Sequence, residues 1–185
     1  MDIARFSGFE CVFMVEHEGV VSAGRSFEDS DFLKTHEKVY HSSRGGRVTI
    51  HNPGQLIVYP VINLRERNIN VGTYVDILEK WIIDSLKEFG IIGSRSSDGR
   101  GVWVSDNTPG GFSDGMKIGF VGIKIENGIA YHGLCVNVNN DLSPFKNIIP
   151  CGIQNISITS ISEMLKTKVS VSKAKAAFTK TCPFD

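Results

Sequence analysis

One predicted turn constrains this chain more than any other feature, because it fixes how two long strands must pair. Residues 117–126 and 129–138 are rich in β-branched residues, and Asn127-Gly128 stands between them. A type I′ turn needs a positive φ at both central positions, and Asn-Gly meets that need. The sequence therefore predicts a long antiparallel β-hairpin over 117–138. Its strands contain several glycines, which indicates that something approaches the backbone closely there.

Residues 71–89 show the clearest helical pattern. Their apolar residues recur at spacings of three and four, which places them on one buried stripe. Asn70 is a suitable N-cap and Gly90 a suitable stop. Asp76 and Lys80 stand four residues apart, as in an ion pair along a helix. The sequence predicts one long helix here.

Weaker patterns predict strands in the N-terminal third. Residues 10–15, 47–51 and 55–64 have the apolar and β-branched content of strands, with Pro53 in the turn between the last two. Residues 26–37 are acidic and predict a surface connection with one helical turn at most.

Towards the C-terminus, Ser160 and Glu163 match a capping box at the start of a short helix, and residues 172–182 suit a further helix. Strands, one long central helix, a hairpin and short helices together predict an α/β domain of the α+β type with a mixed sheet.

Composition excludes several classes of protein. With 185 residues, 41% of them hydrophobic and 22% charged, the chain suits one folded domain over residues 1–185. Twenty basic residues balance twenty acidic ones, so no overall field favours nucleic acid or an anionic membrane. The longest apolar stretch, 56–62, is too short to cross a bilayer. The N-terminus resembles no targeting segment, and the four cysteines form no paired motif, so we expect a cytoplasmic protein without a metal cluster.

Two segments combine glycine with basic residues. In residues 44–55, Gly-Gly amides beside arginine can hold an anion or a carbonyl oxygen, although such turns are also common surface loops. Lys117 heads an apolar, glycine-rich strand. Because lysine is mostly exposed, the pattern alone favours a side chain that points outward.

Two further segments hold a histidine and a cysteine. His132 suits a base, a hydrogen-bond donor or a satisfied core histidine, and no metal-ligand spacing accompanies it. Cys151 stands between Pro150 and Gly152, and this tight turn presents it as a candidate nucleophile. Cys135 lies in a predicted strand, where cysteine is more often a small buried hydrophobe.

Five segments in order carry a resemblance to a known family. They are RGGRVTIHNPGQL (44–56), GVWV (101–104), MKIGFVGIKI (116–125), YHGLCVNVNNDLSPF (131–145) and IPCG (149–152). Together they resemble the octanoyltransferases, the lipoate-protein ligase B family. The resemblance implies the α/β scaffold of biotin and lipoate ligases, and an acyltransferase that acts in protein lipoylation.

The resemblance also implies roles for individual residues. Cys151 matches the catalytic cysteine that carries the acyl group as a thioester, and Lys117 matches the lysine that pairs with it. His132 is a supporting candidate, with His51, for holding an oxyanion. The residues that match the lining of the acyl pocket are Arg44, Gly45, Gly46, Arg47, Val48, Thr49, Ile50, His51, Phe120, Val121, Gly122, Gly133, Leu134 and Cys135.

The implied donor is octanoyl-acyl carrier protein, and the implied acceptors are lipoyl domains of 2-oxoacid dehydrogenase complexes and the glycine cleavage H protein. No cofactor or metal is implied, because transfer from a thioester to an amide is downhill without ATP. Two alternatives stay open: an ATP-dependent lipoate or biotin ligase, and a non-catalytic module that binds an acyl carrier. Cys151 favours the transferase, since an adenylating ligase needs no thiol nucleophile there.

The chain departs from the family pattern in a few places. Ile50 and Asn52 replace a tyrosine and a glycine of the usual motif, and position 119 is a glycine where a side chain, small or larger, is usual. The segment before residue 10 is shorter than in relatives, so either the lineage is shortened or the start lies upstream. Basic residues concentrate in 38–70 and 146–185, which suits an acidic carrier protein unless acids fold nearby.

Overall fold

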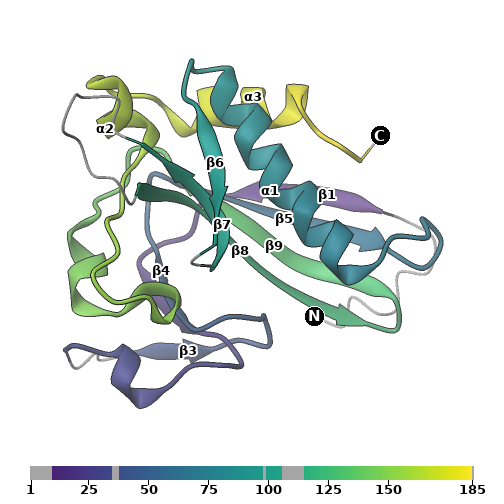
Figure 1. The fold of residues 1–185 in the computed structure, drawn as a ribbon, viewed down its shortest axis with the longest axis horizontal. Helices are drawn as coiled ribbons and strands as arrows, with labels where there is room; N and C mark the ends of the chain where they lie inside the picture. The colour runs from purple at the N-terminus through teal and green to yellow at the C-terminus, as the bar shows by residue number, and fades with distance from the viewer. Residues whose placement is uncertain (1–9, 35–37, 98, 106–114, 185) are drawn as a thin grey trace.

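Six strands form one antiparallel sheet in a computed structural model of the chain, which describes residues 10–34, 38–97, 99–105 and 115–184. The strand order is β1-β5-β9-β8-β7-β6. The strands are β1 (Cys11–Val15), β5 (Gln55–Asn63), β6 (Gly93–Ser96), β7 (Gly99–Val104), β8 (Met116–Glu126) and β9 (Ile129–Asn137). Figure 1 shows this sheet crossing the middle of the molecule, with α1 and α3 beside it.

A second, three-stranded sheet lies at one end of the molecule, where Figure 1 draws it in purple and blue. It contains β2 (Val20–Ala23), β3 (Val39–His41) and β4 (Val48–His51) in the order β3-β2-β4. Strand β2 runs parallel to β3 and antiparallel to β4, so the molecule as a whole has the predicted mixed strand directions. The sequence analysis predicted β4 but neither β2 nor β3.

The hairpin prediction is confirmed. Strands β8 and β9 pair in register from Gly119 with Val136 to Glu126 with Ile129. Asn127 and Gly128 have φ values of 52° and 86°, as the turn requires. The predictions for β1 and β5 are also confirmed, within a residue or two at their ends.

The long helix is α1 (Val71–Lys87), and its predicted N-cap is confirmed, because Asn70 Oδ1 accepts the Thr73 N–H at 2.9 Å. Gly90, at φ 73°, follows its end. The predicted ion pair of Asp76 with Lys80 is wrong. Lys80 pairs with Asp84 instead, one turn further along the helix, while Asp76 reaches Arg100 on β7.

Two shorter helices follow the hairpin. They are α2 (Ile161–Leu165), which Ser160 caps by accepting the Glu163 N–H, and α3 (Val171–Lys180). Both confirm the predicted helices. The Glu163 carboxylate accepts from the Thr159 hydroxyl, at 3.1 Å, and helps to hold this helix start. Among the described residues, no helix is long and apolar enough to span a membrane.

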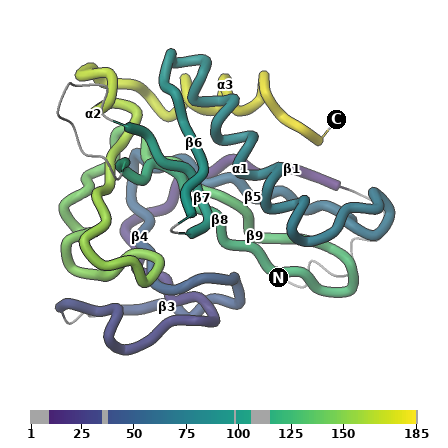
Figure 2. The backbone as a smooth tube through the Cα atoms, in the orientation of Figure 1, coloured from purple at the N-terminus to yellow at the C-terminus, as the bar shows by residue number. Residues whose placement is uncertain are grey.

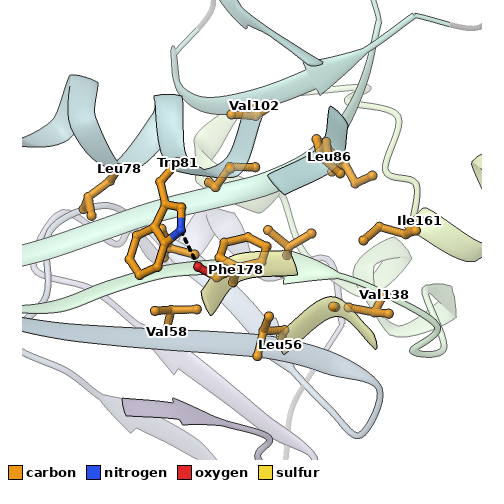
Figure 3. Close-up of a cluster of buried hydrophobic side chains, with 14 of the residues drawn as sticks. Leu56, Val58, Leu78, Trp81, Leu86, Val102, Val138, Ile161 and Phe178 are labelled. Atoms are coloured by element: carbon orange, nitrogen blue, oxygen red, sulfur yellow. Dashed lines mark hydrogen bonds between the residues drawn. The ribbon is translucent and has the colours of Figure 1, made fainter. Parts of the chain in front are cut away.

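Strand alternation sends the side chains of the central strands to two different clusters. On β5, Leu56 and Val58 face the helices, while Ile57 faces the small sheet. Figure 3 shows Trp81 of α1 and Phe178 of α3 packed over Leu56 and Val58, with the Trp81 indole N–H donating to the Phe178 carbonyl at 2.9 Å. The larger cluster therefore anchors both helices to one face of the sheet.

The predicted acidic connection contains one 3₁₀ turn, η2 (Asp29–Asp31), and residues 35–37 lie outside the described residues. Its surface assignment is wrong for Asp31, which is fully buried. A buried carboxylate needs a partner, and Arg47 of the loop before β4 supplies it at 2.8 Å.

The helix face of the core generates a stability prediction. Leu78→Ala should lower the free energy of unfolding by about 2–5 kcal/mol, because it opens a cavity at a fully buried position. Chemical denaturation followed by circular dichroism measures the change. Val71→Ala, on the same helix at a position 54% exposed, is the matched control and should stay within about 0.5 kcal/mol of the parent. Equal losses for both variants would contradict this account of the core.

Candidate active site

Cys151 lies at the tip of a tight turn. Two 3₁₀ turns follow the hairpin, η3 (Ser143–Asn147) and η4 (Pro150–Gly152). Figure 2 shows this green segment running beside β4 towards the small sheet. Cys151 has φ 59°, a left-handed conformation that side chains other than glycine adopt at a cost of about 1–2 kcal/mol. Such strain persists only where the surroundings hold it, and it is common at functional sites.

Contacts from the small sheet hold this turn. The Ile149 N–H donates to the Asp31 carbonyl at 2.7 Å. The Asp31 carboxylate binds Arg47, and a Cβ atom on Gly152 would lie 2.5 Å from Arg47 Cδ. Arg47 therefore packs directly under the turn, where only glycine fits. Its ion pair with Asp31 raises the pKa of the guanidinium above its ordinary value.

Lys117 is fully buried, which corrects the expectation from pattern alone that it points outward. Its ammonium donates to the Arg100 carbonyl at 2.8 Å and lies 4.3 Å from the centre of the Trp103 ring. A carbonyl oxygen and an aromatic face both attract a cation. No carboxylate within the described ranges lies at ion-pairing distance from it, so these groups replace the usual counter-ion.

Lys117 and Cys151 meet in the structure. The distance from Lys117 Nζ to Cys151 Sγ is 3.4 Å, within the range of a hydrogen bond to sulfur. The two residues are 34 positions apart in the chain and belong to β8 and η4. An ammonium at this distance stabilises a thiolate, which is the nucleophilic form of cysteine.

A pocket of about 490 Å³ opens beside Cys151. Apolar side chains such as Ile57, Phe120 and Leu134 line part of it, and polar groups line its other side. Most of the predicted pocket residues border it, namely Arg44, Gly46, Arg47, Val48, Thr49, His51, Phe120, Val121, Gly122, His132, Gly133, Leu134 and Cys135.

Two predicted pocket residues do not border this cavity. Ile50 is buried in the cluster behind β4, and Gly45 donates its N–H to the Ile123 carbonyl at 2.8 Å. The amide of Gly45 is therefore engaged within the protein. One of the two backbone N–H groups of the predicted Gly-Gly anion site is therefore not available to an anion.

Arg44 is held by the backbone around it. Its guanidinium donates to the Ser22 carbonyl at 2.7 Å and to the Gly45 carbonyl at 3.0 Å, while its Nε is buried without a partner among the described residues. Burial lowers the pKa of the guanidinium from its ordinary value, and the nearby Cys135 and Cys151 sulfurs oppose that shift. Arg44 thus places a positive charge close to both thiols.

His51 belongs to a chain of buried amides. Its Nδ1 lies 2.7 Å from Gln55 Oε1, and Gln55 Nε2 donates to Asn137 Oδ1 at 2.9 Å. Because an amide oxygen only accepts, Nδ1 carries the proton and Nε2 is the acceptor. Burial lowers the pKa of His51 to about 4, so the ring is neutral at pH 7. It can accept a hydrogen bond there but supplies no positive charge.

Burial also shifts the pKa values of two other residues that border the pocket, His132 and Cys135. It lowers the pKa of His132, which lies near the Arg44 charge, and raises the pKa of the Cys135 thiol to about 12. Cys135 therefore has the properties of a buried hydrophobe, as its strand position predicted. Among the described residues, no group of three potential ligands could hold a metal ion.

The sequence analysis missed several residues of the pocket. His17 and Tyr59 share a hydrogen bond of 2.7 Å at its edge, and Ser22 and Tyr40 also border it. These residues come from β2, β3, β5 and the connection between β1 and β2, and no local motif marks them. Tyr59 follows Val58 in an apolar run, so only the alternation of β5 indicated that it faces away from the helices.

The comparisons with known proteins identify the class. Residues 4–182 match the family model described as the lipoyl protein ligase A/B catalytic domain. The chain belongs to this family.

Its relatives define the branch within the family. The chain is 42% identical over 170 residues to an octanoyltransferase of Orientia tsutsugamushi (strain Boryong), covering 90% of this chain and 79% of the relative. It is 40% identical over 160 residues to the octanoyltransferase of Neorickettsia sennetsu, covering 85% and 75%. Similarity at this level places the chain among the octanoyltransferases, so it is an acyltransferase.

Solved structures show the same fold at low identity. A structure titled lipoate-protein ligase A bound with ATP aligns with a TM-score of 0.68 at 13% identity, covering 95% of this chain and 72% of that one. A biotin protein ligase from Aquifex aeolicus with biotin and ATP aligns with a TM-score of 0.53 at 13% identity, covering 86% and 69%. The predicted ligase-like scaffold is confirmed.

The environment of His51 generates a prediction on pH. Its pKa falls from 6.5 in the unfolded chain to about 4 in the folded one, so the unfolded state binds more protons between these values. The folding free energy should therefore weaken as the pH falls from 6.5 to 4, by up to roughly 3 kcal/mol from this group. Urea denaturation of the parent and of His51→Gln measures the slope.

The variant should lose part of that slope in this window. His41→Gln removes an exposed histidine and is the matched control, which should keep the slope of the parent. An unchanged slope in His51→Gln would show that His51 titrates normally.

Proposed function

We propose that this chain transfers an octanoyl group from octanoyl-acyl carrier protein to a lysine of a lipoyl domain, through a thioester on Cys151. The single observation that carries the proposal is the contact of Lys117 Nζ with Cys151 Sγ at 3.4 Å, beside a partly apolar pocket. The proposal that the acyl group is octanoyl is supported by the similarity of the chain to octanoyltransferases. Four unpaired thiols suit the cytoplasm.

The first half-reaction begins from the Cys151 thiolate and the Lys117 ammonium. The thiolate attacks the carbonyl carbon of the donor thioester, which forms a new carbon–sulfur bond and a tetrahedral oxyanion. When the oxyanion collapses, the carbon–sulfur bond to the carrier breaks, and the leaving thiolate takes a proton from Lys117. The products are the acyl-enzyme, the free carrier thiol and a neutral Lys117.

The second half-reaction restores the starting state. The acceptor lysine attacks as a neutral amine, forms a carbon–nitrogen bond and gives its extra proton to the neutral Lys117. The Cys151 thiolate then leaves, and it again faces an ammonium. No proton is gained or lost by the pair over the full cycle. The buried position of Lys117 suits this role, since low solvent exposure favours proton exchange with the reacting groups alone.

The apolar part of the pocket suits the acyl chain. Ile57, Phe120 and Leu134 present apolar surface, and His51 is neutral at pH 7. The Arg44 Nε–H, which is buried without a partner among the described residues, is a candidate donor to the oxyanion.

The proposed partners follow from the resemblance and from charge. The donor is the acyl carrier protein, and the acceptors are lipoyl domains of 2-oxoacid dehydrogenase complexes and the glycine cleavage H protein. The basic stretch 38–70 offers less free charge than its sequence suggests, because Arg44 is buried while Arg47 and Arg67 are paired with acids. In 146–185, Lys180 is paired with Glu88, and the other lysines of this stretch remain the better candidate surface for an acidic partner.

A covalent intermediate is the direct test. Incubation with octanoyl-acyl carrier protein and no ATP should add one octanoyl group to the protein by mass spectrometry, and Cys151→Ala should abolish the adduct. Cys11→Ala removes an exposed thiol and is the matched control, which should still be acylated.

Each outcome separates the alternatives. An adduct that survives Cys151→Ala would refute covalent catalysis at this residue. Product that forms only from free octanoate with ATP would identify a ligase, and the absence of both adduct and product would identify a module that only binds a carrier.

Lys117→Met tests the partner of the thiol. Both half-reactions, measured separately in single turnovers, should slow by about 10²-fold or more, because the positioned proton donor and acceptor is lost. Lys124→Met on the same strand is the matched control, since Lys124 pairs with Glu126 and makes no contact with the pocket. Circular dichroism checks that both variants fold. Equal rates in the two variants would remove Lys117 from the mechanism.

A further inference from the structure

A buried acid lies close to the Lys117–Cys151 pair but outside the lining of the pocket. Glu79 is in the middle of α1, and only 1% of its surface is exposed. A carboxylate at such a position is costly to keep unless it is hydrogen-bonded or paired. Nothing in the proposed reaction uses it directly, because it touches neither the pocket nor the thiol.

One oxygen of Glu79 holds the peptide unit that contacts Lys117. The Gly101 N–H donates to Glu79 Oε1 at 2.9 Å. The carbonyl of the same peptide unit belongs to Arg100, and it accepts from Lys117 Nζ at 2.8 Å. A single planar peptide therefore has the carboxylate at its N–H end and the ammonium at its carbonyl end.

The second oxygen of Glu79 faces two arginines near the surface. Arg95 Nε lies at 3.0 Å from it, and Arg100 Nη1 lies at 3.5 Å. These charges offset the cost of burying the carboxylate. They leave Oε1 directed at the Gly101 N–H.

Because residue 101 is a glycine, the orientation of the Arg100–Gly101 peptide depends on contacts from the rest of the molecule. Its φ is 120°, a conformation that other residues rarely adopt, and an added Cβ would lie 2.4 Å from the Gly119 carbonyl and 2.8 Å from Lys117 Cε. Glycine is therefore required at position 101 by its φ and by the close approach of the Gly119 carbonyl, with the Lys117 side chain packed beside it. Because glycine has few steric restrictions, local conformation alone does not fix which way the Arg100 carbonyl points.

We propose that Glu79 is a positioning residue that holds the Arg100–Gly101 peptide so that its carbonyl faces Lys117. The fixed carbonyl keeps the ammonium 3.4 Å from Cys151 Sγ. The carboxylate also polarises the peptide, which strengthens the hydrogen bond from the ammonium. The inference rests on the proposed Lys117–Cys151 pair.

The reactivity of Cys151 towards iodoacetamide as a function of pH reads out this arrangement without any acyl substrate. Cys151 is the thiol under observation in a Cys11→Ala, Cys182→Ala background. Cys135 is only 4% exposed, and burial raises the pKa of its thiol to about 12, so it stays a neutral thiol over the pH range of the measurement. Two further charged side chains lie near Cys151: Arg44, which precedes β4, and Arg47, which packs against Gly152 and is paired with Asp31. Neither belongs to α1. A midpoint that moves to higher pH means that the thiolate has lost stabilisation.

Glu79→Gln keeps the shape and a neutral acceptor but removes the charge. It should move the alkylation midpoint up by about 0.5 pH unit, which is a roughly threefold lower thiolate fraction at neutral pH. Asp84→Asn removes another carboxylate from the same helix, one that pairs only with Lys80 and Lys87 among the described residues, and it should leave the midpoint unchanged.

A double-mutant cycle separates positioning from a general effect on the fold. In a Lys117→Met background, Glu79→Gln should cause no further shift, because its effect passes through Lys117. An equal shift in that background, or no shift in Glu79→Gln alone, would overturn the inference while the proposed pair stands. If Lys117→Met itself leaves the midpoint at the parental value, the pair is refuted and the inference with it.

Discussion

The burial of the Lys117 ammonium is the constraint on which the rest of the site depends. Removing an ammonium from water is costly unless other groups replace its hydration. Here the replacements come from two elements: a carbonyl and an aromatic ring from β7, and a sulfur from η4. The burial of the lysine therefore depends both on the sheet register that brings Trp103 opposite it and on the turn that presents Cys151. The same groups that make its burial tolerable also align it with the thiol.

The central strands serve the core and the pocket at once, because alternate side chains leave opposite faces. The main irregularity lies at Pro60, which has no N–H for the ladder although β5 is an interior strand. The pairing of β5 with β9 is interrupted between the Val58–Leu134 and Ile62–Ala130 pairs. Across this gap, Gly133 approaches so closely that an added Cβ would lie 2.3 Å from the Val58 carbonyl. The next residue towards the turn, His132, has φ 60° and borders the pocket.

Local signals in the sequence predicted local structure well and buried contacts poorly. The Asn127-Gly128 turn and the stripe of α1 are encoded within a few residues, and both predictions are confirmed. Two predictions were wrong: that Lys117 points outward, and that the segment containing Asp31 lies at the surface. The burial of a charge depends on partners far along the chain, which no short stretch of sequence contains. The pairing of Cys151 with Lys117 was predicted from the resemblance to a family, because no spacing in the sequence indicated it. No local signal marked Glu79, which stands between Leu78 and Lys80 in the helical pattern.

Cys151 and Lys117 are fixed by two different parts of the molecule. Lys117 belongs to the six-stranded sheet, and the Glu79 contact ties its surroundings to α1. Cys151 follows Ile149, which is bound to the Asp31 carbonyl, and Asp31 is bound to Arg47 beside the small sheet. The 3.4 Å distance between Nζ and Sγ therefore depends on how the two sheets pack, through the cluster that contains Ile57, Phe120 and Ile148. It also depends on the segment after η4, where the Lys117 N–H donates to the Ser157 carbonyl and the Thr159 N–H donates to the Lys117 carbonyl. A change in the packing of this cluster would alter the reactivity of the thiol without touching either residue.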